Sequence, residues 1–130
     1  MNIEDQPGVV MYHRHKDPAQ LFAYIRPTEI RFSVQCGNHI GLVQDGHIVV
    51  FNIGKEWYLA VDNDNEKGYR IVSDQTRSGY RVSLSAVVRA ITKDLNPGFT
   101  KVDCVLEKTN LEFHGIVCYK ICKREFSGKS

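Results

Sequence analysis

The sequence predicts a single α+β domain, in which a curved antiparallel β-sheet is covered by one amphipathic helix. Three observations lead to this prediction. Several stretches alternate apolar and polar residues with the period of two that half-buried strands have. Turn-forming dipeptides separate these stretches at the short spacing of consecutive hairpins. The period changes to 3.6 over residues 84–95 and then returns to two, so we expect one helix followed by a C-terminal hairpin.

The composition is that of an ordinary globular domain. The chain has 130 residues, 42% of them hydrophobic and 25% charged, which fits one domain with a substantial core. Its net charge is +2, so a basic surface would require the charges to be sorted onto one face. No apolar run approaches the roughly 18 residues of a membrane span, and the N-terminus lacks the features of an export signal. We therefore expect a cytoplasmic protein whose four cysteines are free thiols.

The domain is expected to span residues 24–123. Residues 1–23 show no clean period and are interpreted as a loosely ordered N-terminal arm, with one short strand at 9–12. Residues 124–130 are polar and are expected to fray. The first regular strand of the domain is predicted at 30–35, and the segment 36–39 should interrupt it as a turn.

Hairpins account for the next part of the chain. Residues 47–53 and 56–62 are rich in β-branched and aromatic residues and flank Gly54-Lys55, which is typical of a hairpin turn. Further strands are predicted at 69–73 and 80–82. Together with the strands after the helix, the sheet should contain about five to seven strands.

The helix prediction rests on a stripe of apolar residues at helical spacing. The stripe consists of Leu84, Val87, Val88, Ile91 and Leu95. Ser83 is predicted to cap the first turn, and Asn96-Pro97-Gly98 should end the helix. Alternation resumes at 101–107 and 116–122, and His114-Gly115 can supply the turn of a closing hairpin.

Candidate metal ligands do not form a convincing set. Cys36 and His39 could be combined with Cys118 and Cys122 in a zinc site, but the second pair lies on a predicted strand at a spacing of roughly 13 Å. Residues 62–68 resemble the start of a calcium loop, but they lack the glycine and glutamate that such a loop needs. His13-Arg14-His15 is interpreted as surface. We expect packed thiols and no metal or other cofactor.

Catalytic signatures are also missing from the sequence. It has no nucleophile-elbow, P-loop or dinucleotide-binding pattern, and its carboxylates are scattered. The sequence therefore favours a protein that is not an enzyme.

Aromatic and basic residues alternate along several predicted strands. A sheet face with tyrosines and arginines can stack bases and track phosphates, although the same residues are common on half-exposed sheets. The candidate binding residues are Arg31, Tyr58, Tyr69, Arg70, Tyr80 and Arg81.

Two resemblances add to this interpretation. The segment from Ile40-Gly41-Leu42 through Asp45-Gly46, Trp57-Tyr58-Leu59-Ala60 and Ser83 to Ile91 resembles small uncharacterised bacterial proteins, which imply no activity. The order of strands followed by a helix is similar to the single-stranded nucleic-acid-binding sheets of the PC4, Whirly and PUR type. That similarity implies a curved sheet backed by a helix, commonly in a dimer, but the present chain has two further predicted strands after the helix.

The leading hypothesis is a non-enzymatic binding module for single-stranded DNA or RNA that forms a homodimer and does not bind membranes. The arginines would contact phosphates and the tyrosines would stack on bases. The alternative is a protein-interaction or assembly module, because tyrosine and arginine are also enriched at protein interfaces.

Overall fold

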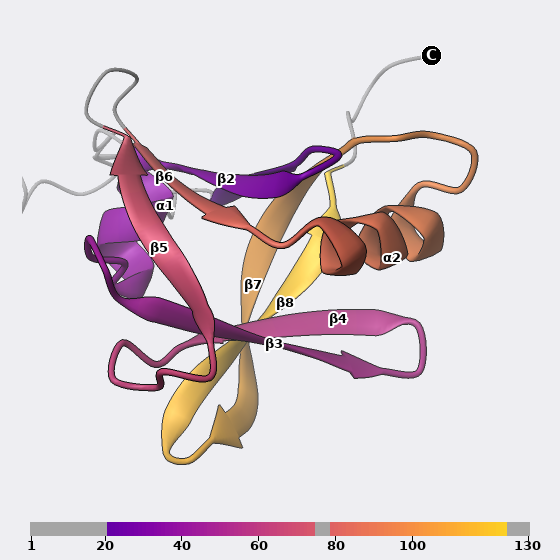
Figure 1. Cartoon of the computed structure of the whole chain (residues 1–130). Coiled ribbons are helices and arrows are strands. Elements are labelled where there is room, and N and C mark those ends of the chain that lie inside the picture. Colours follow the sequence, from indigo (N-terminus) through magenta and orange to yellow (C-terminus); the bar gives the residue numbers. More distant parts are fainter. Residues whose placement is uncertain (1–20, 75–78, 125–130) are drawn as a thin grey trace, which may run out of the picture.

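The computed structural model describes residues 21–74 and 79–124, which form eight strands and two helices (Figure 1). In chain order these elements are β1 (Phe22–Ile25), β2 (Glu29–Ser33), α1 (Val34–Ile40), β3 (His47–Ile53), β4 (Glu56–Val61), β5 (Tyr69–Asp74), β6 (Gly79–Ser83), α2 (Ser85–Leu95), β7 (Val102–Phe113) and β8 (Ile116–Lys123). The α+β class and the antiparallel sheet that the sequence predicts are confirmed.

The sheet closes into a barrel. Its strands follow the order β1-β2-β6-β5-β3-β4-β8-β7, every neighbouring pair is antiparallel, and β7 pairs back with β1. The expected sheet of five to seven strands was therefore too small, since the described residues supply eight. The missed strand is β1. Its first two residues fall in the predicted arm, and its last two fall in the predicted domain, where no strand was expected. Because β1 pairs with both β2 and β7, this short strand is what closes the barrel.

The interior of the barrel is aliphatic. Alternate residues of each strand point inward, and the inward residues of β1 and β2 are completely or almost completely buried. The largest fully buried side chains include Ile25, Ile30, Ile48, Leu59, Ile71 and Ile121. Trp57 and Val61 pack against this core from β4, on the same face as Leu59.

A short helix, α1, replaces the turn predicted at 36–39. The strand ends at Ser33, whose side chain accepts a hydrogen bond from the backbone N–H of Cys36 (3.1 Å) and so caps α1. Cys36 and Ile40 are buried beneath the helix, and Gly41 ends it with a φ of 91°. The predicted strand 30–35 was therefore too long at its C-terminal end, because a local cap and two buried side chains outweigh the continued alternation.

The helix predicted near 84–95 is confirmed as α2. It lies across the barrel between β2 and β4 (Figure 1), and it buries Val88 and Ile91 completely. The indole Nε1 of Trp57 donates a hydrogen bond of 2.8 Å to Asp94 and so ties the helix to β4. The predicted cap at Ser83 is wrong: Leu84 occupies the N-cap position, and no side chain caps the helix there. Burial of Leu84 in the core fixes the start of the helix instead.

The predicted hairpins at Gly54-Lys55 and His114-Gly115 are confirmed. His114 and Gly115 both have positive φ, as a tight turn requires. The last hairpin is longer than expected, since β7 continues to Phe113 with an irregularity between Lys108 and Glu112. Its far end extends below the rest of the barrel (Figure 1).

No helix in the described ranges is long and apolar enough to cross a membrane. The strand predicted at 9–12, the segment His13-Arg14-His15 and nearly all of the tail that was expected to fray lie outside the described residues.

Candidate nucleic-acid interface

One side of the barrel carries a row of directly opposed residues across five neighbouring strands. The strand register places Asp103 of β7 opposite Tyr24 of β1, Tyr24 opposite Arg31 of β2, and Arg31 opposite Arg81 of β6. Arg81 in turn lies opposite Val72 of β5. Because opposed residues in a sheet point to the same face, these side chains share the outer surface of the barrel.

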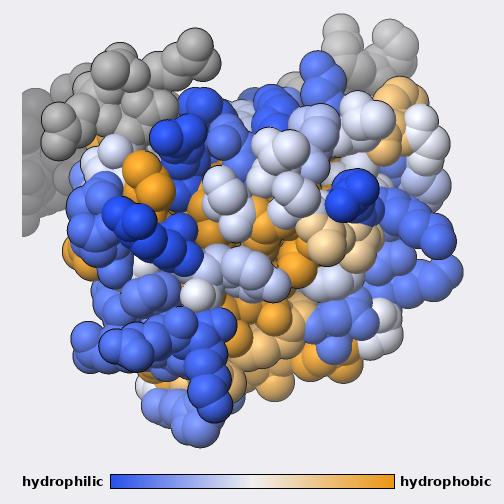
Figure 2. All heavy atoms as spheres, viewed as in Figure 1, coloured by the Kyte–Doolittle hydropathy of each residue, from blue (hydrophilic) through white to orange (hydrophobic). Residues whose placement is uncertain are grey.

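Further cations and one aromatic ring border this row. Phe22 and Arg26 lie two residues before and after Tyr24, and Arg70 lies two residues before Val72, so they face outward as well. Arg124 follows β8 and places its guanidinium over Phe22. We call this surface the arginine–aromatic wall, and it consists of Phe22, Tyr24, Arg26, Arg31, Arg70, Arg81 and Arg124. Figure 2 shows how hydrophilic side chains cover the β5 side of the molecule.

The two rings of the wall are stacked and bordered by guanidinium groups. The centroids of Phe22 and Tyr24 lie 6.5 Å apart with an interplanar angle of 25°. The guanidinium of Arg124 lies 4.4 Å from the centroid of the Phe22 ring, and that of Arg26 lies 5.6 Å from the centroid of the Tyr24 ring. Cation–π contact holds these flexible side chains beside the rings. Both rings are half-buried, so they have firm support and retain accessible surface.

Carboxylates hold several of these arginines in place. Asp103 accepts a hydrogen bond of 3.0 Å from Arg26, and Glu29 is paired with Arg31 while its second oxygen lies 4.0 Å from Arg81. On β5, Arg70 donates a hydrogen bond of 2.7 Å to Asp45. Solvent-accessible ion pairs contribute little free energy. A phosphate could therefore replace these carboxylates as the partner of the arginines at small cost.

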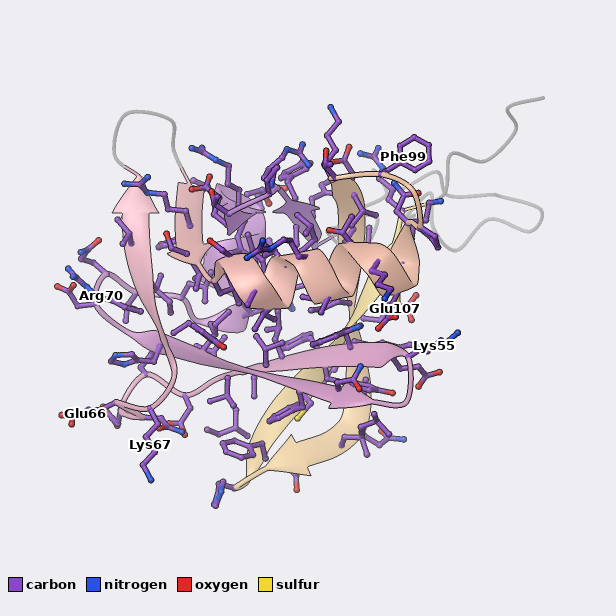
Figure 3. The ribbon with its side chains drawn as sticks, turned by 45° about the vertical axis from the view of Figure 1, so that its right-hand side comes forward. Lys55, Glu66, Lys67, Arg70, Phe99 and Glu107 are labelled. Carbon is purple, nitrogen blue, oxygen red and sulfur yellow. The ribbon has the colours of Figure 1, made fainter. Side chains whose placement is uncertain are left out.

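The structure separates the six residues that the sequence analysis selected. Arg31, Arg70 and Arg81 share the arginine–aromatic wall, and Figure 3 shows Arg70 projecting from its side of the barrel. The three tyrosines lie elsewhere. Tyr69 and Tyr80 pack against the core, and the hydroxyl of Tyr80 donates to Asn38 of α1 (3.0 Å).

Four members of the wall were not selected from the sequence: Phe22, Tyr24, Arg26 and Arg124. A usable signal was present in the alternation of residues 21–26, where Leu21, Ala23 and Ile25 are buried and the residues between them face outward. The alternation covers only four strand residues and adjoins an aperiodic segment, so it did not stand out.

The opposite side of the barrel has a different character. There a hollow of about 240 Å³ is lined by apolar side chains of β3, β4, β7 and β8. Ile53 and Leu111 are 56% and 45% exposed beside it. We call this surface the apolar wall, and it consists of Phe51, Ile53, Tyr58, Leu111, Phe113 and Cys118. Figure 2 shows apolar side chains gathered below α2, over β3 and β4.

Tyr58 belongs to the apolar wall and is 7% exposed, so it offers little ring surface for stacking. Its hydroxyl donates a hydrogen bond of 2.7 Å to Glu56, which also accepts one of 3.3 Å from Lys120. The hydrogen bonds from Tyr58 and Lys120 lower the pKa of Glu56, and the hydrogen bond to Glu56 raises the pKa of Tyr58. The polar atoms here are therefore paired with one another at the edge of the hollow.

The part of the chain that the structure describes contains no assembled metal site. No three His, Cys, Asp or Glu side chains come together there as ligands. Cys36 and Cys104 are fully buried, and desolvation raises the pKa of each thiol to about 12. These thiols are therefore protonated and inert at neutral pH.

No protein-family model matches the chain, and comparison with curated proteins and with solved structures finds no match.

Proposed function

We propose that this protein binds single-stranded nucleic acid along the arginine–aromatic wall. The observation that carries the proposal is the stacked pair Phe22 and Tyr24, bordered by the guanidinium groups of Arg26 and Arg124 and continued across the sheet by Arg31 and Arg81. Aromatic rings that alternate with cations on a sheet are the recurring means by which proteins hold unpaired strands.

The two kinds of side chain have separate tasks. The arginines attract the phosphate backbone, which gives an affinity that falls with salt concentration. The rings offer their faces to bases, and only an unpaired strand can turn its bases toward them. Among the described residues, the wall has no protruding helix or β-ribbon of the kind that enters a major groove, so single strands should bind better than duplex.

The test is fluorescence anisotropy of the full chain with labelled single-stranded DNA, single-stranded RNA and duplex DNA over a series of salt concentrations. We expect preference for single strands. Tyr24→Ala should lower the affinity by about tenfold at every salt concentration, since one stacking interaction is worth ~1–3 kcal/mol. Arg31→Ala combined with Arg81→Ala should reduce the slope of log K against log salt by about 0.7 for each phosphate that the variant no longer neutralises.

Lys55→Ala is the matched control, because Lys55 is an exposed cation in the β3–β4 turn, away from the wall (Figure 3). It should leave both affinity and slope unchanged. Failure of all three nucleic acids to bind at low salt would overturn the proposal.

The apolar wall supports a second candidate function, the self-association that the sequence analysis keeps as its alternative. Exposed apolar side chains around a hollow are typical of interaction surfaces. Absence of nucleic-acid binding, together with a concentration-dependent sedimentation coefficient that Ile53→Glu abolishes, would favour this function.

A further inference from the structure

A second hollow adjoins the arginine–aromatic wall at the end of the barrel near the C-terminus of α2. Its volume is about 210 Å³, and its lining includes Asn96, Phe99, Lys101, Asp103, Lys123 and Arg124. We call it the α2–β7 pocket. Arg124 is itself a member of the wall, and Asp103 forms an ion pair with Arg26 of the wall. The pocket is therefore continuous with the wall.

An exposed aromatic ring stands at this pocket. Phe99 is 67% exposed, and it projects from the loop after α2, away from the helix (Figure 3). Gly98 precedes it with a φ of 87°, and the backbone N–H of Phe99 donates to the carbonyl of Asn96 (3.2 Å). The backbone that carries the ring is therefore held on a defined turn, and most of the ring surface is accessible to a ligand.

Three of the four charged side chains that line the pocket are cations. Lys101, Lys123 and Arg124 line it, and the carboxylate of Asp103 is already engaged by Arg26 at 3.0 Å. Asn96 positions the Lys123 side chain, whose ammonium donates to the Asn96 amide oxygen (3.1 Å), and its amide nitrogen donates to the backbone carbonyl of Lys101 (2.9 Å). An anion in this pocket would meet the positioned cations of Lys123 and Arg124 with little competition from carboxylates.

We propose that the α2–β7 pocket binds one nucleotide unit, with the base stacked on Phe99 and the phosphate held by Lys101 and Lys123. An aromatic face beside clustered cations matches a nucleotide, which joins a flat base to an anionic phosphate. The volume is below the roughly 300 Å³ at which pockets for drug-sized ligands begin, so the pocket suits a single base. The inference rests on the proposed function, because the unit would be the end of a strand that crosses the wall.

The direct test is an NMR titration of the ¹⁵N-labelled full chain with adenosine 5′-monophosphate, adenosine and inorganic phosphate, each added alone. Adenosine 5′-monophosphate should shift the amide signals of Phe99, Lys101 and Lys123 at lower concentration than either of the other probes. In Phe99→Ala, adenosine 5′-monophosphate should act at no lower concentration than phosphate. In Lys123→Ala, it should act at no lower concentration than adenosine. Equal shifts with phosphate and the nucleotide, or none at the pocket, would overturn the proposal.

The same variants separate the pocket from the wall. With a labelled single strand, Phe99→Ala should weaken binding by about tenfold without changing the salt slope, whereas Lys55→Ala, in the exposed β3–β4 turn, should change neither. The nucleotide titration is repeated on Tyr24→Ala. If the nucleotide still shifts the amide signals of the pocket in that variant while the wild type fails to bind oligonucleotides, the proposal for the wall is wrong and the nucleotide pocket is right.

Discussion

At the scale of single residues, burial decides the chemistry of the cysteines. Cys36 and Cys104 have no exposed surface, and desolvation raises the pKa of each from an ordinary 9.0 to about 12. Cys122 is half-buried, and its pKa is raised to about 11, again mainly by desolvation. The sequence analysis interpreted these cysteines as packed thiols. Their environments explain why none of the three would serve as a nucleophile at neutral pH.

The thiol shifts predict that stability falls at alkaline pH. Between pH 9 and about 12 the unfolded chain loses the Cys36 proton while the folded chain keeps it, so rising pH favours the unfolded state. Urea titrations at pH 8 and pH 10.5 should therefore show a smaller loss of stability for Cys36→Ala than for the wild type. The cavity left by this substitution lowers stability at both pH values, and it leaves the difference unaffected. Equal losses in the two proteins would contradict the prediction.

At the scale of elements, local capping and tertiary burial begin the two helices in different ways. A side-chain hydrogen bond to Ser33 starts α1, whereas α2 starts at Leu84 without one. Packing reinforces α1 from outside, because a Cβ on Gly37 would lie only 2.1 Å from the Tyr80 ring. The short helix and β6 are thus in contact so close that only glycine fits.

The two serines provide a matched pair that tests this difference. Ser33→Ala should lower the free energy of unfolding by ~1 kcal/mol, the usual cost of losing an N-cap side chain. Ser83→Ala should change it by less than about 0.5 kcal/mol, as for an ordinary surface substitution, because Ser83 makes no cap bond. The measurement is urea unfolding followed by the fluorescence of Trp57, the single tryptophan of the chain. A larger effect at Ser83 than at Ser33 would refute the assignment of the caps.

At the scale of the whole molecule, closure joins distant parts of the chain. β1 bridges β2 and β7, so residues near the start and the end of the described chain share one hydrogen-bonded sheet. This closure also builds the arginine–aromatic wall, since Phe22 and Tyr24 come from β1 and their cationic neighbours from β2 and from Arg124. Folding and the proposed site therefore depend on the same short strand.

Because β1 closes the barrel, we predict that a destabilising substitution in β1 lowers the stability of the whole barrel. Ile25→Ala removes a fully buried side chain and should cost ~2–5 kcal/mol. Because the barrel is one sheet, Trp57 fluorescence and far-ultraviolet circular dichroism should lose their folded signals at the same, lowered urea concentration. Ile53→Ala, at an exposed position of β3, should shift the midpoint little. Separate midpoints for the two probes in Ile25→Ala would show that β1 unfolds independently.

The sequence by itself determined the α+β class, the extent of α2 and the hairpins at Gly54-Lys55 and His114-Gly115. These features depend on periodicity and turn chemistry, which act between residues close together in the chain. For the same reason it identified Arg31, Arg70 and Arg81 as cations on strands.

Only the tertiary structure decided that the sheet closes and that β1 belongs to it. Strand geometry already separates Tyr69 from Arg70 and Tyr80 from Arg81, since neighbouring residues of a strand point to opposite faces. Strand order and register depend on contacts between residues far apart in the chain, which a local period of two does not determine. The stacked pair of Phe22 and Tyr24 became a candidate site only when pairing with β2 and β7 placed it among the arginines.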